Sequence, residues 1–191
     1  MRLRKLREEL GHQLRIEWRS FPLRPVPDPT VRFHGTYREA AWKRIQALTA
    51  ADGILYEPWS KEEYPTWSLP SLEATKCAAL QGEELFERLH LRLYEAFFTR
   101  GINIGEPQHV ARIAEEAGCE MDQYRVDLES GHARALVLQD VELAARHHGV
   151  RAIPTIIIIT DNGEPRERSL VGLQPIETYR SALQAREPPR Y

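Results

Sequence analysis

Apolar residues recur at helical spacing along most of the chain. Leu85, Leu89, Leu93 and Phe97 fall at steps of four, which predicts a long helix over residues 83–99. The same reasoning, with glycine stops and capping residues, predicts further helices over residues 2–10 and about 36–50, 72–80, 107–118, 122–131, 132–148 and 175–185.

Two segments follow a strand pattern instead. Residues 14–18 alternate apolar and charged side chains, which predicts a strand. Residues 155–159 are β-branched and apolar throughout, as is typical of a strand buried on both faces. The turn signal at 161–163 then predicts a hairpin that returns over residues 166–171.

The order of these elements predicts an α/β fold. A strand, a long helical block and a second strand require a crossover, which implies parallel pairing, and the hairpin adds an antiparallel strand. We therefore expect a mixed sheet with a large all-helical insertion. The division we expect is 1–60 and 149–191 for the two parts of the sheet domain, with 61–148 as the insertion.

Composition excludes several classes of protein. The net charge is −2, so no global basic field favours nucleic acid. The longest apolar run, Ile156–Ile159, is too short to span a bilayer. With two cysteines and no apolar leader, we expect a cytoplasmic protein rather than a disulfide-stapled secreted one. An oligomer remains open.

The candidate chemistry within the chain is sparse. Cys77 sits on the apolar side of a helix and is interpreted as a buried structural thiol. Cys119 follows a helix C-terminus, where the dipole raises a thiol pKa. His147 and His148 are adjacent and point apart on a helix, and no His-Glu-x-x-His or phosphate loop occurs. We therefore expect no metal and no cofactor.

Several segments are informative through their order and spacing along the chain: Arg15–Phe21, Trp67–Ala74, Phe86–His90, Leu93–Phe98, Ile104–Pro107, Ala114–Gly118 and Gly149–Thr155. Together they resemble the DsbA family of thioredoxin-like proteins, and more narrowly its FrnE-like branch. The resemblance covers nearly the whole chain.

The entry to the 155–159 strand is the most informative local element. A proline at the start of a buried strand is unusual, because proline cannot donate to the ladder. By resemblance, the Ile153–Pro154 bond is expected to be cis, and Ile153, Pro154 and Thr155 are expected to bind substrate. The Ile153 backbone would then pair with an extended peptide.

The family's redox motif is absent from the chain. DsbA-type chemistry uses a Cys-x-x-Cys at the start of the helix that here covers residues 2–10, yet no cysteine precedes Cys77. We expect that the chain lacks an upstream strand and its motif. A truncated relative, or a partner that supplies the strand, stays open. No catalytic residue is therefore assigned within this chain.

The resemblance implies a protein thiol–disulfide oxidoreductase that acts on thiol- or disulfide-containing proteins or small molecules, inactive in the chain as given. One alternative is a glutathione-dependent isomerase or transferase, in which serine replaces the first cysteine. Another is a non-catalytic thioredoxin-like protein that binds peptides or partners. We expect neither nucleic acid nor a membrane as a partner.

Overall fold

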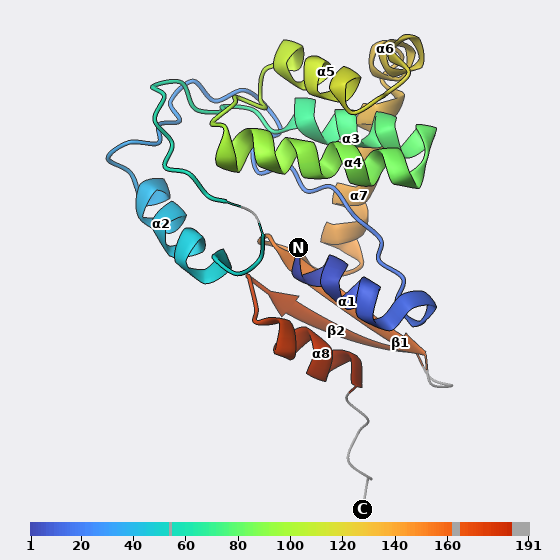
Figure 1. Ribbon diagram of the computed structural model, residues 1–191. Helices are drawn as coiled ribbons and strands as arrows, with labels where there is room; N and C mark the ends of the chain where they lie inside the picture. Colours follow the sequence, from blue (N-terminus) through green and yellow to red (C-terminus); the bar gives the residue numbers. More distant parts are fainter. Residues whose placement is uncertain (54, 162–164, 185–191) are drawn as a thin grey trace, which may run out of the picture. The chain divides into compact units, whose positions relative to one another are not determined.

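The computed structural model describes residues 1–53, 55–161 and 165–184. Its contacts divide the chain into two compact units, one made of residues 1–18 with 142–191 and the other of residues 19–141 (Figure 1). The elements are α1 (Arg2–Leu10), η1 (Gly11–Gln13), α2 (Tyr37–Thr49), α3 (Leu69–Gln81), α4 (Glu83–Tyr94), η2 (Glu95–Thr99), α5 (Pro107–Glu116), α6 (Met121–Glu129), α7 (His132–Arg146), β1 (Thr155–Asp161), β2 (Pro165–Val171) and α8 (Ile176–Gln184).

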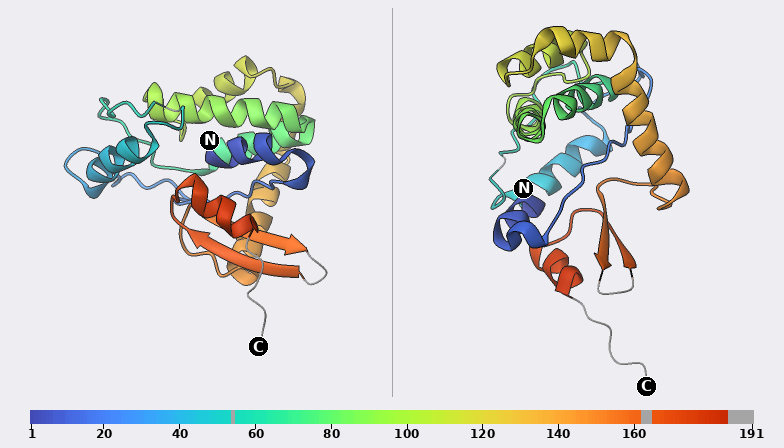
Figure 2. Two further views of the ribbon diagram at one scale, coloured as in Figure 1. Left: turned by 60° about the horizontal axis from the view of Figure 1, so that its bottom comes forward. Right: turned by 90° about the vertical axis from the view of Figure 1, so that its right-hand side faces the viewer.

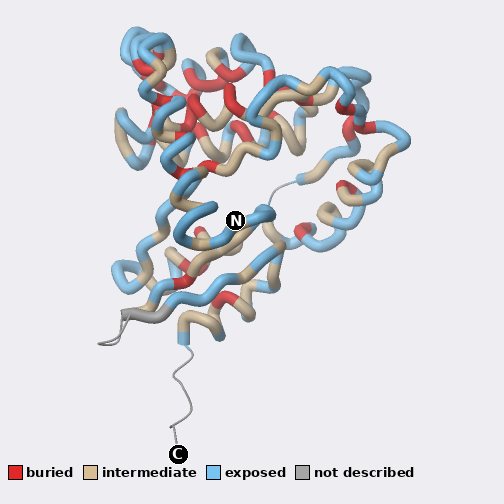
Figure 3. The backbone as a smooth tube through the Cα atoms, turned by 180° about the vertical axis from the view of Figure 1, so that it is seen from behind, coloured by how far each residue is buried: buried red, intermediate tan, exposed pale blue. Residues whose placement is uncertain are grey.

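The unit of residues 19–141 is helical, and α3 lies at its centre. Helix α3 packs against α4, α5 and α6 (Figure 1). Buried positions concentrate in these helices (Figure 3), where Leu89, Val110 and Cys77 are almost inaccessible to solvent. The predicted steps of four in α4 therefore do form one buried face.

A second core in this unit is aromatic. Phe33, Trp42 and Trp59 are buried, and four partly buried rings pack around them: Tyr56, Tyr64, Phe97 and Phe98. The Phe33 and Trp42 rings meet edge to face with their centroids 5.4 Å apart. These rings come from α2, from the loops before and after it, and from the π-helical turn η2, so the cluster joins segments that are distant in sequence.

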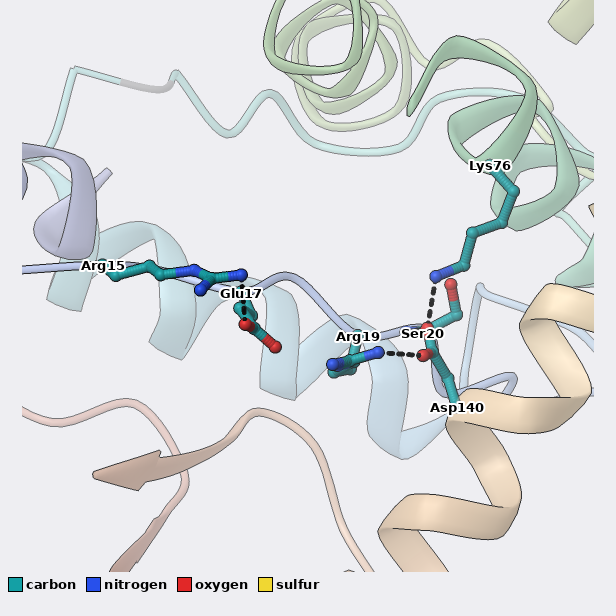
Figure 4. Close-up of polar contacts among 6 residues, drawn as sticks. All are labelled: Arg15, Glu17, Arg19, Ser20, Lys76 and Asp140. Atoms are coloured by element: carbon teal, nitrogen blue, oxygen red, sulfur yellow. Dashed lines mark hydrogen bonds and ion pairs between the residues drawn. The ribbon is translucent and has the colours of Figure 1, made fainter. Parts of the chain in front are cut away.

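A buried carboxylate fastens the start of the same unit (Figure 4). Asp140 is 3% exposed and accepts hydrogen bonds from Lys76 Nζ at 2.5 Å, from the Ser20 N–H at 2.7 Å and from Arg19 Nη1 at 3.2 Å. Three donors satisfy a charge that would otherwise be costly to bury. The segment after residue 18 is thereby attached to both α3 and α7.

The unit of residues 1–18 and 142–191 is built on a hairpin. Strands β1 and β2 pair antiparallel, with Thr155 opposite Val171 and Ile158 opposite Arg168. Helix α8 lies against α1 and β1 (Figure 2). Arg180 binds Glu9 at 2.7 Å, which links α8 to α1 across most of the sequence.

The structure corrects the predicted mixed sheet. Residues 14–18 are extended at their start but form no strand, and the described sheet has two antiparallel strands only. Alternation favours an extended backbone, but a strand also needs a ladder, and the described sheet contains only β1 and β2. The parallel pairing predicted for this segment is therefore not found in the described sheet.

The expected burial of β1 on both faces is also wrong. Ile158 is 6% exposed, whereas Ile159 is 64% exposed. In a strand successive side chains point to opposite faces, and the face that holds Ile158 is covered more fully than the face that holds Ile159. The predicted turn at 161–163 lies mostly outside those residues.

Most helix boundaries agree with prediction within a few residues. Thr36 caps α2 through a hydrogen bond from the Arg38 N–H to its hydroxyl. Glu120 caps α6 by accepting hydrogen bonds from the Asp122 and Gln123 N–H groups. The division into 1–60, 61–148 and 149–191 stays a prediction. Across the described residues, every helix is too short or too polar to cross a membrane.

Replacing Asp140 by alanine will destabilise the protein strongly. The change leaves the Lys76 ammonium buried without its carboxylate, which costs about 3–5 kcal/mol of unfolding free energy. Urea unfolding followed by circular dichroism measures the loss. The matched control is Asp122→Ala, which removes an exposed carboxylate bound to Arg125 and should cost little. Equal losses in the two variants would contradict the role given to Asp140.

Candidate functional site

The loop before β1 is the candidate site. The Ile153–Pro154 peptide bond is cis in this structure, and residues 151–154 are all exposed to solvent. The Ile153 side chain is 44% exposed, which is high for an isoleucine beside a strand. The predicted residues Ile153 and Pro154 thus lie on one exposed turn, and the half-buried Thr155 follows them as the first residue of β1.

Two hydrogen bonds hold this loop on its hairpin. The Gly172 N–H donates to the Pro154 carbonyl at 2.8 Å, which extends the register of Thr155 and Val171 by one pair. The Thr155 hydroxyl donates to the Ala152 carbonyl at 2.6 Å. Both bonds involve groups around Ile153, so they fix the loop without using the Ile153 backbone.

The Ile153 backbone is available to a ligand. Its N–H and C=O make no hydrogen bond to the part of the chain that the structure describes. Exposed backbone groups beside a strand can pair with an extended peptide, whose side chains then contact the neighbouring surface. The arrangement can therefore bind a peptide in an extended conformation.

Exposed apolar side chains lie close in register to the Ile153 backbone. Val171 and Leu173, at the end of β2 and just after it, are exposed like Ile153. The bond between Pro154 and Gly172 places Ile153 and Leu173 one step further along the same register. Sequence reasoning missed these two residues. Only their position relative to the predicted hairpin turn, counted along the returning strand, could have indicated them.

Neither cysteine of the chain provides a reactive thiolate. Both lie in the core of the helical unit, as predicted for Cys77. Burial, reinforced by the negative charge of Asp127, raises the pKa of Cys77 to about 12. Burial also raises the pKa of Cys119, while the positive charge of Arg88 opposes this. The cause for Cys119 is thus loss of solvent, whereas the sequence suggested the helix dipole.

The histidines form no metal-binding cluster among the described residues. Across the ranges that the structure describes, no cluster of three His, Cys, Asp or Glu side chains could hold a metal ion. His148 Nδ1 lies 2.9 Å from Glu167 Oε1, which joins the end of α7 to β2. His90 stacks beside Tyr94 on α4 with their centroids 4.6 Å apart. Both histidines have contacts typical of structural residues.

Curated relatives share modest identity with the chain. YwbO, an uncharacterised protein of Bacillus subtilis, is 26% identical over 152 residues, which are 78% of this chain and 74% of YwbO. The ClpXP adapter protein SpxH of Halalkalibacterium halodurans is 24% identical over 192 aligned residues, or 95% of this chain. SpxH of Shouchella clausii is 29% identical over 58% of it. The aligned parts span only 60% and 37% of these two SpxH proteins.

A solved structure and a family model agree on the fold. The structure of a candidate protein disulfide isomerase from Nitrosomonas europaea superposes with a TM-score of 0.71 at 16% identity, over 96% of this chain and 86% of that one. The model of the DSBA-like thioredoxin domain matches residues 1–184. The chain therefore has a DsbA-like thioredoxin fold with a helical insertion and belongs to the family of DSBA-like thioredoxin domains.

Proposed function

We propose that this chain is the substrate-binding framework of a DsbA-type thiol–disulfide oxidoreductase. The observation that carries the proposal is the exposed loop at Ile153, whose backbone groups have no partner among the described residues. Family membership supports a substrate with a thiol or disulfide group. In this proposal Ile153 and Thr155 align an extended peptide through backbone hydrogen bonds, and Pro154 shapes the turn between them.

The redox pair of this proposal is not the pair of cysteines in the chain. A thiol whose pKa lies near 12 is almost entirely protonated at neutral pH and attacks a disulfide poorly. The oxidoreductase therefore requires a Cys-x-x-Cys in a segment before residues 2–10, which is the family's order. The proposal includes the FrnE-like branch and a cytoplasmic location, both expected from sequence.

The coding sequence ahead of Met1 tests the requirement for an upstream Cys-x-x-Cys. A segment that encodes a strand and Cys-x-x-Cys supports the oxidoreductase, and serine in place of the first cysteine supports the glutathione-dependent alternative.

A binding function without catalysis is the second candidate. Two relatives are named ClpXP adapter proteins, and one of the alignments spans 95% of this chain. An adapter would use the same exposed loop to hold a partner protein without reacting with it. A stop codon ahead of Met1 favours this candidate, as does peptide binding without redox turnover by the complete protein.

The Ile153→Lys variant will bind unfolded peptide weakly. Lysine adds a charge beside apolar Val171 and Leu173. The dissociation constant for the S-carboxymethylated insulin B chain should therefore rise at least about tenfold. Fluorescence anisotropy of the labelled B chain measures the binding. Ile159→Lys is the matched control, because it makes the same change at an exposed position further along β1. Binding that is unchanged in Ile153→Lys, or equally lost in both variants, counts against the loop as the site.

The native thiols will resist alkylation where ordinary thiols react. Since burial raises the pKa of Cys77 to about 12 and that of Cys119 above its usual range, iodoacetamide should label neither quickly between about pH 8 and 10. Mass spectrometry counts the labels, and the urea-unfolded chain is the control in which both thiols react.

The 191-residue chain should also not accelerate insulin reduction by dithiothreitol. Turnover lost in a Cys77→Ala/Cys119→Ala variant would refute this assignment.

A further inference from the structure

Three arginines around the start of α2 are bound in an unusual way. Arg24 Nη1 donates to the Pro65 carbonyl at 3.2 Å, Arg32 Nη1 to the Pro29 carbonyl at 2.6 Å, and Arg38 Nη1 to the Arg32 carbonyl at 3.3 Å. Within the described residues, none of the three guanidinium groups forms an ion pair. Each is oriented by a neutral carbonyl oxygen rather than by a carboxylate.

Three other arginines of the helical unit are paired with carboxylates instead. Arg112 binds Glu116, Arg125 binds Asp122, and Arg134 binds Glu73. A guanidinium held by carbonyls keeps further N–H donors in a planar fork that matches a carboxylate. Because Arg24, Arg32 and Arg38 keep such donors, they form a place where negative charge can bind.

Two of these arginines lie over tyrosine rings, and both lie near the same carboxylate. The Arg24 guanidinium lies over the Tyr64 ring at 5.8 Å, and that of Arg38 lies over the Tyr37 ring at 4.8 Å. Tyr37 is 73% exposed. Hydrogen bonds from Thr30, and then the charges of Arg24 and Arg38, lower the pKa of Asp28, so both arginines lie near this carboxylate. Asp28 accepts hydrogen bonds from the Thr30 N–H and hydroxyl. One carboxylate beside three arginines leaves an excess of positive charge on this surface.

The loop that carries this surface is held in place. The Asp28 N–H donates to the Thr66 carbonyl at 3.1 Å, and the Ser68 N–H donates to the Arg24 carbonyl at 3.0 Å. Three prolines restrict the same loop, which precedes α2 in Figure 1: Pro25, Pro27 and Pro29. A partner would bind a preformed surface and would pay little entropy to order it.

Exposed aliphatic side chains lie in the same loop. Leu23 is 61% and Val26 67% exposed, on either side of Arg24. Protein interfaces are enriched in arginine and tyrosine, with apolar groups beside them, and this loop has the same composition. Phosphates would use the arginines but not the aliphatic groups, so this composition favours a polypeptide over a nucleic acid.

We propose that Arg24, Arg32, Arg38, Tyr37, Leu23 and Val26 form an arginine–tyrosine surface that binds an acidic segment of a partner protein. Carboxylates of the segment accept from the guanidinium groups, and its apolar side chains cover Leu23 and Val26. The surface lies wholly within the unit of residues 19–141 and is separate in sequence from the Ile153 loop.

A labelled peptide of alternating acidic and apolar residues (Glu, Asp, Leu and Phe) tests the surface by fluorescence anisotropy. We expect binding that weakens with added salt, and at least about tenfold weaker binding by Arg24→Glu/Arg38→Glu. Arg112→Glu on α5 is the matched control and should bind as the parent chain does. Tyr37→Ser keeps the charges and should also weaken binding, while circular dichroism verifies that each variant is folded.

Three results would overturn the proposal. The first is equal binding of a peptide in which Gln and Asn replace Glu and Asp. The second is unchanged binding by the folded Arg24→Glu/Arg38→Glu variant. The third is a different occupant: a single-stranded oligonucleotide that displaces the labelled peptide at lower concentration than unlabelled peptide does, or self-association of the chain that this variant abolishes.

Discussion

The hydrogen bond from the Gly172 N–H to the Pro154 carbonyl is the contact on which the candidate site depends. It closes the hairpin of β1 and β2 one pair beyond its last strand residues, and so it sets where the preceding loop leaves the sheet. Ile153 falls just outside that bond. Its backbone therefore lies beside a strand without joining the ladder, which is the condition for pairing with an incoming peptide.

Chemistry and binding are separated in this chain. The two thiols are buried in the helical core, where loss of solvent keeps them protonated. The two surfaces that we propose for recognition are exposed, by contrast: one offers backbone groups at Ile153, and the other offers guanidinium groups around Tyr37. Membership of the DSBA-like thioredoxin family supports the thiol substrates of the proposed function.

Local patterns predicted the helices well, because helical spacing and caps such as Thr36 act within one turn. Residues 14–18 show the limit of local patterns: alternation favoured an extended backbone, but it could not establish that another strand lies beside it. Asp140 could not be predicted either, since Lys76 and Ser20 are 64 and 120 residues away. For the site, resemblance indicated residues 153–155, but only the hairpin register adds Leu173.

Amide hydrogen exchange at Ile153 tests the central claim most directly. The measurement compares the chain alone with the chain saturated by an unfolded peptide, such as S-carboxymethylated insulin B chain. The account predicts that the Ile153 N–H exchanges freely in the absence of peptide and becomes protected when peptide is bound, because it then donates to the peptide backbone. Saturation that leaves Ile153 unprotected while amides elsewhere slow down would contradict the account.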